Sequence, residues 1–163
     1  MIPIFPITPE TPADTAEIEH IHADAFGPGR YARAAFRLRE QGPHSLAHSF
    51  VTRHDGGICA TLRMTPIMIG TTPAWLLGPL AVLPSHAGRG LGRALLGHAL
   101  ASVSEPVLLV GDPPYYGPFG FRAVSPHAVV MPGPVDATRL LVAGLDDADR
   151  AGLSGVVRHR NRA

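Results

Sequence analysis

The chain has 163 residues, of which 45% are hydrophobic, and its length favours a single domain over residues 1–163 with one sizeable core. Its formal net charge of +1 argues against the basic surface that nucleic-acid binding needs. Its charged fraction, 17%, is below the roughly 25% typical of globular proteins, so an apolar subunit interface, as in a homodimer, is expected.

Membrane insertion and secretion are not expected from the sequence. The chain contains no run of 18 apolar residues, which a membrane-spanning helix would require. Residues 1–4 lack the basic region of a signal peptide, and the single cysteine, Cys59, cannot form an intramolecular disulfide. These features together predict a cytoplasmic protein.

The N-terminal quarter of the chain predicts an edge strand and two helices. Isoleucine alternates with proline over residues 2–7, as in a strand at the edge of a sheet. Thr11–Asp14 supplies a capping hydroxyl, a proline at the first helical position and a carboxylate three residues after the cap, so a helix should begin there and end at Phe26. A second helix is predicted over Tyr31–Arg39.

Three antiparallel strands are predicted next. Apolar runs indicate strands at Ser49–Arg53 and Ile58–Ile67, joined by a turn at His54–Gly57, and a third strand at Trp75–Leu83. Gly78-Pro79 interrupts the third strand, removing one backbone donor and loosening the chain, which predicts a bulge. A bulge would splay this strand from its neighbour and leave main-chain N–H and C=O groups unpaired.

A glycine-rich turn follows the third strand and leads directly into an apolar-periodic helix. Glycines at every second position from 88 to 92 allow positive φ and let a bulky anion approach the backbone N–H groups at the helix N-terminus. Arg89 and Arg93 add full positive charges. The turn lacks the Lys-Ser/Thr ending of a P-loop and the spacing of a dinucleotide-binding turn, so it predicts another phosphate-bearing ligand.

The C-terminal half predicts a crossover and two further strands. The helix over Gly92–Val103 and the all-apolar strand over Pro106–Val110 complete a strand, helix, strand order. Further strands are predicted in Ala123–Met131 and over Leu140–Leu145. The basic residues in 156–163 predict a flexible, solvated tail.

Two motifs in this order resemble the GNAT acetyltransferase family. Val82-Leu83-Pro84 followed by Ala87–Gly92 is similar to the family's V-x-P and Q/R-x-x-G-x-G/A acetyl-CoA motif, with alanine where Gln or Arg is usual. Tyr115–Phe121 is similar to its F-Y-x-x-x-G-F segment. Within the family, Leu77–Val82 and Val110–Tyr116 are most similar to the YhbS-like branch.

The resemblance implies an α/β GNAT fold: a mixed, mostly antiparallel central sheet with a bulged, splayed strand and flanking helices. It implies an N-acetyltransferase in which a primary amine of a small molecule or protein attacks acetyl-CoA directly in a ternary complex. The splayed strand would hold the pantetheine arm and the glycine turn the pyrophosphate. The acetyl-CoA-binding residues that it implies are Leu80, Ala81, Val82, Ala87, Gly88, Arg89, Gly90, Leu91, Gly92, Arg93 and Tyr116.

The chemistry needs a proton donor near the sulfur, because an oxyanion develops and a thiolate leaves. By the resemblance, Tyr116 is the general acid and the Val82 backbone N–H meets the oxyanion. The general base stays open, since the strands from Ile58 to Leu83 contain no carboxylate; the candidates are His86, Asp112 and a water relay. A non-catalytic module that binds or senses acyl-CoA is the alternative function.

No metal site is predicted. His44 and His48 have the spacing of helical metal ligands, but no glutamate accompanies them as in H-E-x-x-H. The chain also lacks the G-x-S-x-G of a serine hydrolase. Four arginines are candidates for lining an acceptor pocket for an anionic molecule: Arg30, Arg37, Arg39 and Arg63.

Overall fold

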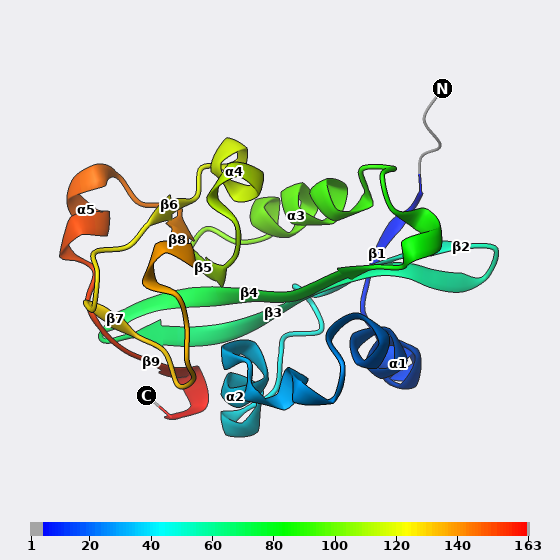
Figure 1. Ribbon diagram of the computed structural model, residues 1–163, viewed down its shortest axis with the longest axis horizontal. Coiled ribbons are helices and arrows are strands. Elements are labelled where there is room, and N and C mark those ends of the chain that lie inside the picture. The colour runs from blue at the N-terminus through cyan, green and yellow to red at the C-terminus, as the bar shows by residue number, and fades with distance from the viewer. Residues whose placement is uncertain (1–4, 163) are drawn as a thin grey trace.

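A mixed sheet forms the centre of the molecule (Figure 1). The computed structural model describes residues 5–162, apart from the side chains of residues 31 and 32. The strands of this part of the chain are β1 (Ile7–Pro9), β2 (Phe50–His54), β3 (Gly57–Ile69), β4 (Thr72–Val82), β5 (Val107–Val110), β6 (Arg122–Ala123), β7 (Val129–Val130), β8 (Leu140–Ala143) and β9 (Gly155–His159). They run in the order β1-β2-β3-β4-β5-β8-β6, while β9 pairs with β3 and β7. The β4–β5 and β7–β9 pairs are parallel and the others antiparallel, which confirms the predicted mixed sheet.

Helices cover both faces of this sheet (Figure 1). One face carries α3 (Leu91–Ala101) and the short α4 (Pro113–Tyr116), and the other carries α1 (Thr15–Phe26) and α2 (Ala34–Gln41). Beyond the end of the sheet lies α5 (Asp147–Gly152). A 3-10 turn at Pro12–Asp14 precedes α1, and the Thr11 N–H donates to Asp14 Oδ2 at 2.9 Å, as expected for the predicted helix start.

The long β3–β4 hairpin carries the predicted bulge. Leu62 pairs with Leu80 and Met64 with Leu77, so the two residues Gly78-Pro79 of β4 lie opposite a single residue of β3. The extra residue in β4 shifts its register relative to β3. The interruption therefore lies where the sequence predicts it.

Past Leu76, β4 and β5 diverge. The two strands pair at Trp75 and Leu76, and between described residues the pairing does not continue toward the C-terminal ends of the strands. The stretch Leu77–Val82 consequently has β3 on one side and no strand on the other. This is the splayed strand that the sequence predicts, and it creates the gap in which the candidate site lies.

The two faces of the sheet bury different side chains. Under α3, Leu95 and Leu96 are fully buried together with Leu62 and Met64 of β3. Burying a leucine or methionine side chain away from water stabilises this layer by about 1.5–3 kcal/mol for each residue. Under α1 the layer also contains a fully buried histidine, His22, and ion pairs described below.

The C-terminal segment was expected to be a flexible basic tail, and this prediction is wrong. Gly155–His159 is strand β9, which pairs with the end of β3, and Val157 is buried. The Arg160 side chain donates to the Ala74 carbonyl oxygen at 2.8 Å and to Glu105 at 3.0 Å. The basic composition was misleading because these charges flank a strand whose alternate residues are buried.

Other differences lie in short elements. The strand expected in Ala123–Met131 is two strands, β6 and β7, separated by a turn in which His127 has a φ of 63°. The sequence did not predict α4 and α5, because four and six residues are too few to show helical periodicity. The predicted N-terminal strand begins at residue 2, and its residues 2–4 lie outside the described part of the chain, where the first strand is β1 at Ile7–Pro9. No helix in the described chain is long and apolar enough to cross a membrane.

Candidate active site

A cavity of about 790 Å³ opens where β4 leaves β5. One wall is β4 itself, and a second wall is formed by the end of β5 with α4 and the first turn of α3. The third wall comes from the α1–α2 segment and from residues 131–139. Segments from five parts of the sequence thus enclose one space beside the splayed strand.

The main chain of β4 presents unused hydrogen-bonding groups to this cavity. The Leu83 N–H donates to the Cys59 carbonyl oxygen on β3 at 2.8 Å. Because alternate residues of an antiparallel strand direct their main-chain groups to opposite sides, those of Ala81 also face β3, whereas those of Leu80 and Val82 face the gap. Leu80 and Val82 line the cavity, but Ala81 is buried on the α1 side and does not.

The predicted glycine turn is open at the N-terminus of α3. Gly88 and Gly90 both have a φ of 76°, and a Cβ added to either would meet no atom within 4 Å. The space above this backbone is therefore free for a ligand, and the first-turn N–H groups of α3 have no partner within the helix. Arg89 and Arg93 are exposed beside them. The turn retains the anion-binding geometry although its first residue, Ala87, offers no polar side chain.

Gly92 connects this turn to the cavity. It lines the cavity from the first turn of α3, and a Cβ at this position would lie 2.8 Å from the Tyr115 hydroxyl. The Arg93 guanidinium lies 5.6 Å from the centroid of the same tyrosine ring. Leu91, in contrast, directs its side chain into the core. Absence of a side chain on Gly92 thus leaves room for Tyr115.

Tyr116 lies on the cavity wall at the end of β5. Its ring packs against Gly111, where a Cβ would overlap it, and makes an edge contact with Phe121 at a centroid distance of 5.8 Å. Burial, followed by the neighbouring Tyr115 and Asp112, raises the pKa of Tyr116 to about 12. No hydrogen bond engages its hydroxyl among the side chains that the structure describes, so this protonated group is available as a donor.

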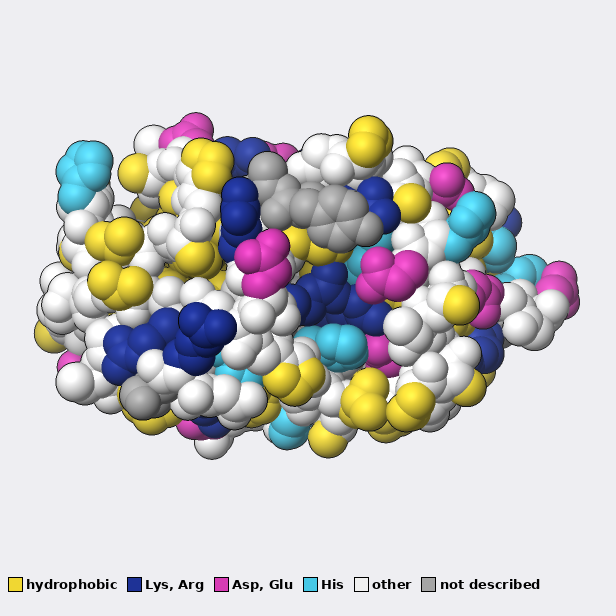
Figure 2. Space-filling model, turned by 90° about the horizontal axis from the view of Figure 1, so that it is seen from below, with side chains coloured by type: hydrophobic (Ala, Val, Ile, Leu, Met, Phe, Trp, Pro, Cys, Tyr) yellow, Lys and Arg dark blue, Asp and Glu magenta, His cyan; other side chains and the backbone are white. Residues whose placement is uncertain are grey.

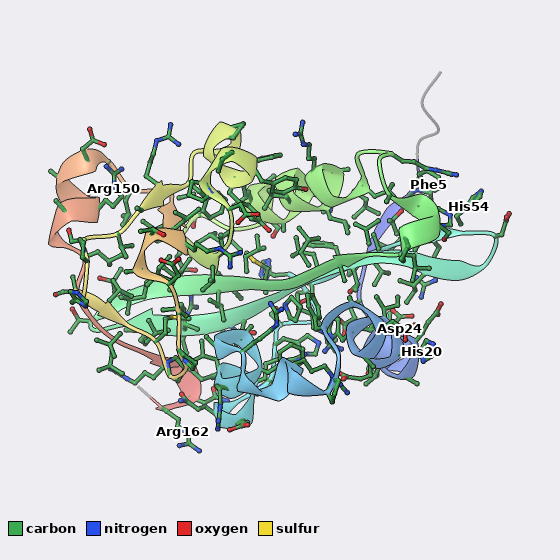
Figure 3. The ribbon with its side chains drawn as sticks, viewed as in Figure 1. Phe5, His20, Asp24, His54, Arg150 and Arg162 are labelled. Atoms are coloured by element: carbon green, nitrogen blue, oxygen red, sulfur yellow. The ribbon has the colours of Figure 1, made fainter. Side chains whose placement is uncertain are left out.

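The two side-chain candidates for the general base lie in different places. His86 Nε2 is 3.0 Å from His54 Nδ1, and Figure 3 shows His54 beside Phe5 at the end of the sheet farthest from β9. His86 does not line the cavity. Asp112 does line it, with an exposed carboxylate 3.3 Å from Arg139, and its carbonyl oxygen accepts the Tyr116 N–H at 3.1 Å.

The wall opposite α4 was missed by sequence reasoning. Phe26, Arg33 and Phe36 reach the cavity from the α1–α2 segment, and Met131 and Val135 reach it from beyond β7. No local pattern marks these residues, because chain segments about a hundred positions apart bring them together. The arginines that were candidates for this role, Arg30, Arg37, Arg39 and Arg63, are not among the lining residues.

Arg63 instead belongs to a buried ion cluster under the sheet. Its guanidinium contacts both Glu10 carboxylate oxygens at 3.1 Å and Glu19 at 3.1 Å, and His44 Nε2 lies 2.8 Å from Glu10. Burial alone would raise the pKa of Glu10, but the hydrogen bonds from His44 and Arg63 hold it below its ordinary value. Figure 2 shows acidic, basic and histidine side chains gathered in the middle of this face.

His22 lies in the same layer without a hydrogen-bond partner for either ring nitrogen among the described residues. Its ring packs against Phe26 and Phe36 at centroid distances of 5.9 and 5.7 Å. Burial, reinforced by the charges of Arg63 and Arg39, lowers the pKa of His22 to about 4. The imidazole is therefore neutral at physiological pH and supports the aromatic wall of the cavity from behind.

Comparison with known proteins places the cavity in context. The family model of the acetyltransferase (GNAT) domain matches residues 45–123. Over 156 residues the chain is 28% identical to the uncharacterized N-acetyltransferase YhbS of Escherichia coli K12, covering 92% of this chain and 93% of that protein.

Solved structures give the same picture. The structure of Escherichia coli YhbS in complex with CoA superposes with a TM-score of 0.77 at 27% identity, covering 96% of this chain and 90% of that one. A GNAT family acetyltransferase from Brucella melitensis in complex with acetyl-CoA has a TM-score of 0.57 at 25% identity, covering 90% and 98%. Both similarities extend over nearly all of this chain.

Proposed function

Because this chain belongs to the GNAT family of acetyltransferases, we propose that it transfers the acetyl group of acetyl-CoA to a primary amine by direct attack in a ternary complex. Two relatives of similar length were solved with CoA and with acetyl-CoA, which supports acetyl-CoA as the cosubstrate. We retain a cytoplasmic location and a homodimer as predictions.

Acetyl-CoA would lie along the splayed strand. The pantetheine arm would pair with the free main-chain groups of Leu80 and with the Val82 carbonyl oxygen, as an added strand pairs with a sheet edge, which leaves the Val82 N–H for the thioester oxygen. The diphosphate would accept hydrogen bonds from the N–H groups of the turn Ala87–Gly92, with Arg89 and Arg93 adding charge. Ala81 would contribute only by keeping β4 on β3.

In this arrangement the reaction proceeds at the end of the cavity near Tyr116. The amine nitrogen forms a bond to the thioester carbon, and the Val82 N–H donates to the developing oxyanion. The C–S bond then breaks, and Tyr116 gives its proton to the leaving thiolate. The nitrogen of the intermediate loses its remaining extra proton through water to the Tyr116 oxygen, which leaves a neutral amide, free CoA thiol and a protonated tyrosine. The ammonium proton of the acceptor leaves beforehand through water to Asp112, which lines the cavity, whereas His86 does not.

The observation that carries this proposal is that a half-buried, protonated tyrosine and an unpaired strand edge line the same cavity. The test incubates the purified protein with acetyl-CoA and a panel of primary amines and measures free CoA thiol. We expect release that depends on at least one amine. Tight acetyl-CoA binding with no amine-dependent release would instead support a non-catalytic acyl-CoA-binding module.

A further inference from the structure

We propose that the acceptor is an apolar amine that also carries an anionic group, and that Arg33 binds this group. The proposal rests on the proposed acetyl transfer and adds the chemical class of the acceptor. It follows from the composition of the cavity wall that faces away from the glycine turn. An apolar amino acid is the simplest molecule of this class.

The acceptor side of the cavity is mostly apolar. The α1–α2 segment contributes the aromatic rings of Phe26 and Phe36, whose centroids are 6.5 Å from each other. Three apolar side chains of the segment after β7 face the same space: Met131, Pro134 and Val135. Such walls favour a hydrocarbon or aromatic body and disfavour a polyhydroxylated one, whose hydroxyl groups would lose their hydrogen bonds to water.

The charged side chains that line the cavity differ in whether they have a partner. Asp112 pairs with Arg139 at 3.3 Å, and Asp136 accepts hydrogen bonds from the Thr138 N–H and hydroxyl at 2.9 and 2.7 Å. For Arg33, no acidic partner lies within ion-pair distance in the part of the chain that the structure describes. Arg33 is therefore the cavity cation whose charge is not matched.

Arg33 is also held in a defined orientation. Its guanidinium carbon lies 4.8 Å from the centroid of the Phe26 ring, so the flat cation stacks on an aromatic wall of the cavity. Stacking uses the face of the guanidinium and leaves its N–H donors at the edge free. Those donors match the two oxygens of a carboxylate or phosphate.

The positions of the charges fit a zwitterion. Asp112 is next to Tyr116 in the wall, where the reacting amine must lie, and attracts its ammonium form. Arg33 lies on the other wall, on the α1–α2 segment, where it can receive an anionic group on the same molecule. A polyamine is a poor fit, because a second ammonium group would meet Arg33.

The experiment compares matched acceptors that differ only in the anionic group. L-phenylalanine, L-methionine and L-leucine are each compared with their carboxamides as acceptors of acetyl-CoA, with kcat and KM measured from thiol release. O-phosphoethanolamine against ethanolamine distinguishes a phosphate from a carboxylate. For wild type we expect kcat/KM to be at least tenfold higher for the anionic member of the preferred pair. The difference should lie in a lower KM, with kcat nearly equal for the two members.

Three variants assign the effect to Arg33. Arg33→Gln should raise KM for the anionic acceptor about tenfold, leave kcat within about twofold and remove the preference over the neutral member. Arg33→Lys should recover part of the preference for the anionic acceptor, since the positive charge is kept but the pair of parallel N–H donors is lost. Arg37→Gln, in the helix α2 that begins directly after Arg33 but outside the cavity wall, is the matched control and should change nothing.

A binding measurement keeps this inference separate from the catalytic one. N-acetyl-L-phenylalanine, a product of the reaction, is titrated into the protein–CoA complex of wild type and Arg33→Gln, with N-acetyl-L-phenylalaninamide as the neutral probe. Tighter binding of the acid that depends on Arg33 supports the assignment even if no amine reacts. Equal affinity for acid and amide, or an unchanged ratio in Arg33→Gln, overturns the assignment and leaves the acetyl transfer standing.

Discussion

The two sides of the cavity are built from different parts of the polypeptide. On the side of α3 and α4, the ligand-facing groups are mainly main-chain N–H and C=O groups of β4 and of the turn before α3. On the side of α1 and α2, they are side chains such as Arg33 and Phe26, supported by buried charges and by His22. A main-chain site suits a cosubstrate common to many relatives, whereas a side-chain site can change its ligand by substitution.

The largest effect is expected at Tyr116, the proposed proton donor on the cosubstrate side. Tyr116→Phe should lower kcat by roughly 100-fold to 10,000-fold, because the thiolate loses its proton donor, while the acetyl-CoA Kd changes little. Steady-state kinetics and a binding titration check both quantities. Tyr115→Phe, which removes the neighbouring hydroxyl next to Gly92, should keep kcat within about fivefold.

An unchanged kcat in Tyr116→Phe at saturating substrate would assign that side of the cavity to binding alone. The raised pKa of Tyr116, about 12, adds a second check. Its hydroxyl stays protonated to well above pH 9, so any fall in rate between pH 7 and 9 must come from another group.

On the acceptor side, the buried ion cluster should show a large effect on stability. Arg63→Met leaves the carboxylate of Glu10, which is fully buried, without its main cation, and should lower the free energy of unfolding by about 3–5 kcal/mol. Urea unfolding measures it, with Arg37→Met as the exposed control. Adding Glu10→Gln to Arg63→Met should recover part of the loss. A loss below about 1 kcal/mol would show that buried charges do not stabilise the α1–α2 side of the cavity.

The same side of the sheet should make stability depend on pH. The pKa of His22 is about 4 in the folded protein against 6.5 for an ordinary histidine, so the unfolded chain takes up a proton first as the pH falls. The contribution of neutral His22 to the free energy of unfolding is therefore complete above pH 6.5. It is lost as the pH falls from 6.5 to 4, and the loss amounts to about 3 kcal/mol. Urea unfolding at several pH values should show this slope in wild type and in His20→Gln, whose histidine is exposed, and a reduced slope in His22→Gln.

The smallest effects are expected on α3, where two glycines form a matched pair. Gly92→Ala places a methyl group 2.8 Å from the Tyr115 hydroxyl and should raise the acetyl-CoA Kd about fivefold. Gly97→Ala meets no atom within 4 Å and should leave that Kd unchanged while increasing the free energy of unfolding by about 0.5–1 kcal/mol. An equal acetyl-CoA Kd in the two variants would show that Gly92 does not take part in acetyl-CoA binding.

The same contrast explains what sequence reasoning could predict. The bulge at Gly78-Pro79, the glycine turn and the helix behind it are local patterns, and the structure has each of them within two residues of the predicted bounds. Arg33 and Val135 meet only because α1, α2 and the segment after β7 fold against β4, and no periodicity carries that information. Strand β9 was missed for a related reason, since the register that buries Val157 depends on β3, far away in the chain.

Strand β9 also has a consequence for synthesis of the chain. Ile67–Ile69 of β3 has its second neighbour only in Val157–His159, which the ribosome adds much later. Until then the nascent protein carries an apolar β-strand with one open edge, the kind of surface that pairs with other chains and starts aggregation. Substitutions that weaken β9, although remote from the cavity, should therefore lower the yield of folded protein before they alter its activity.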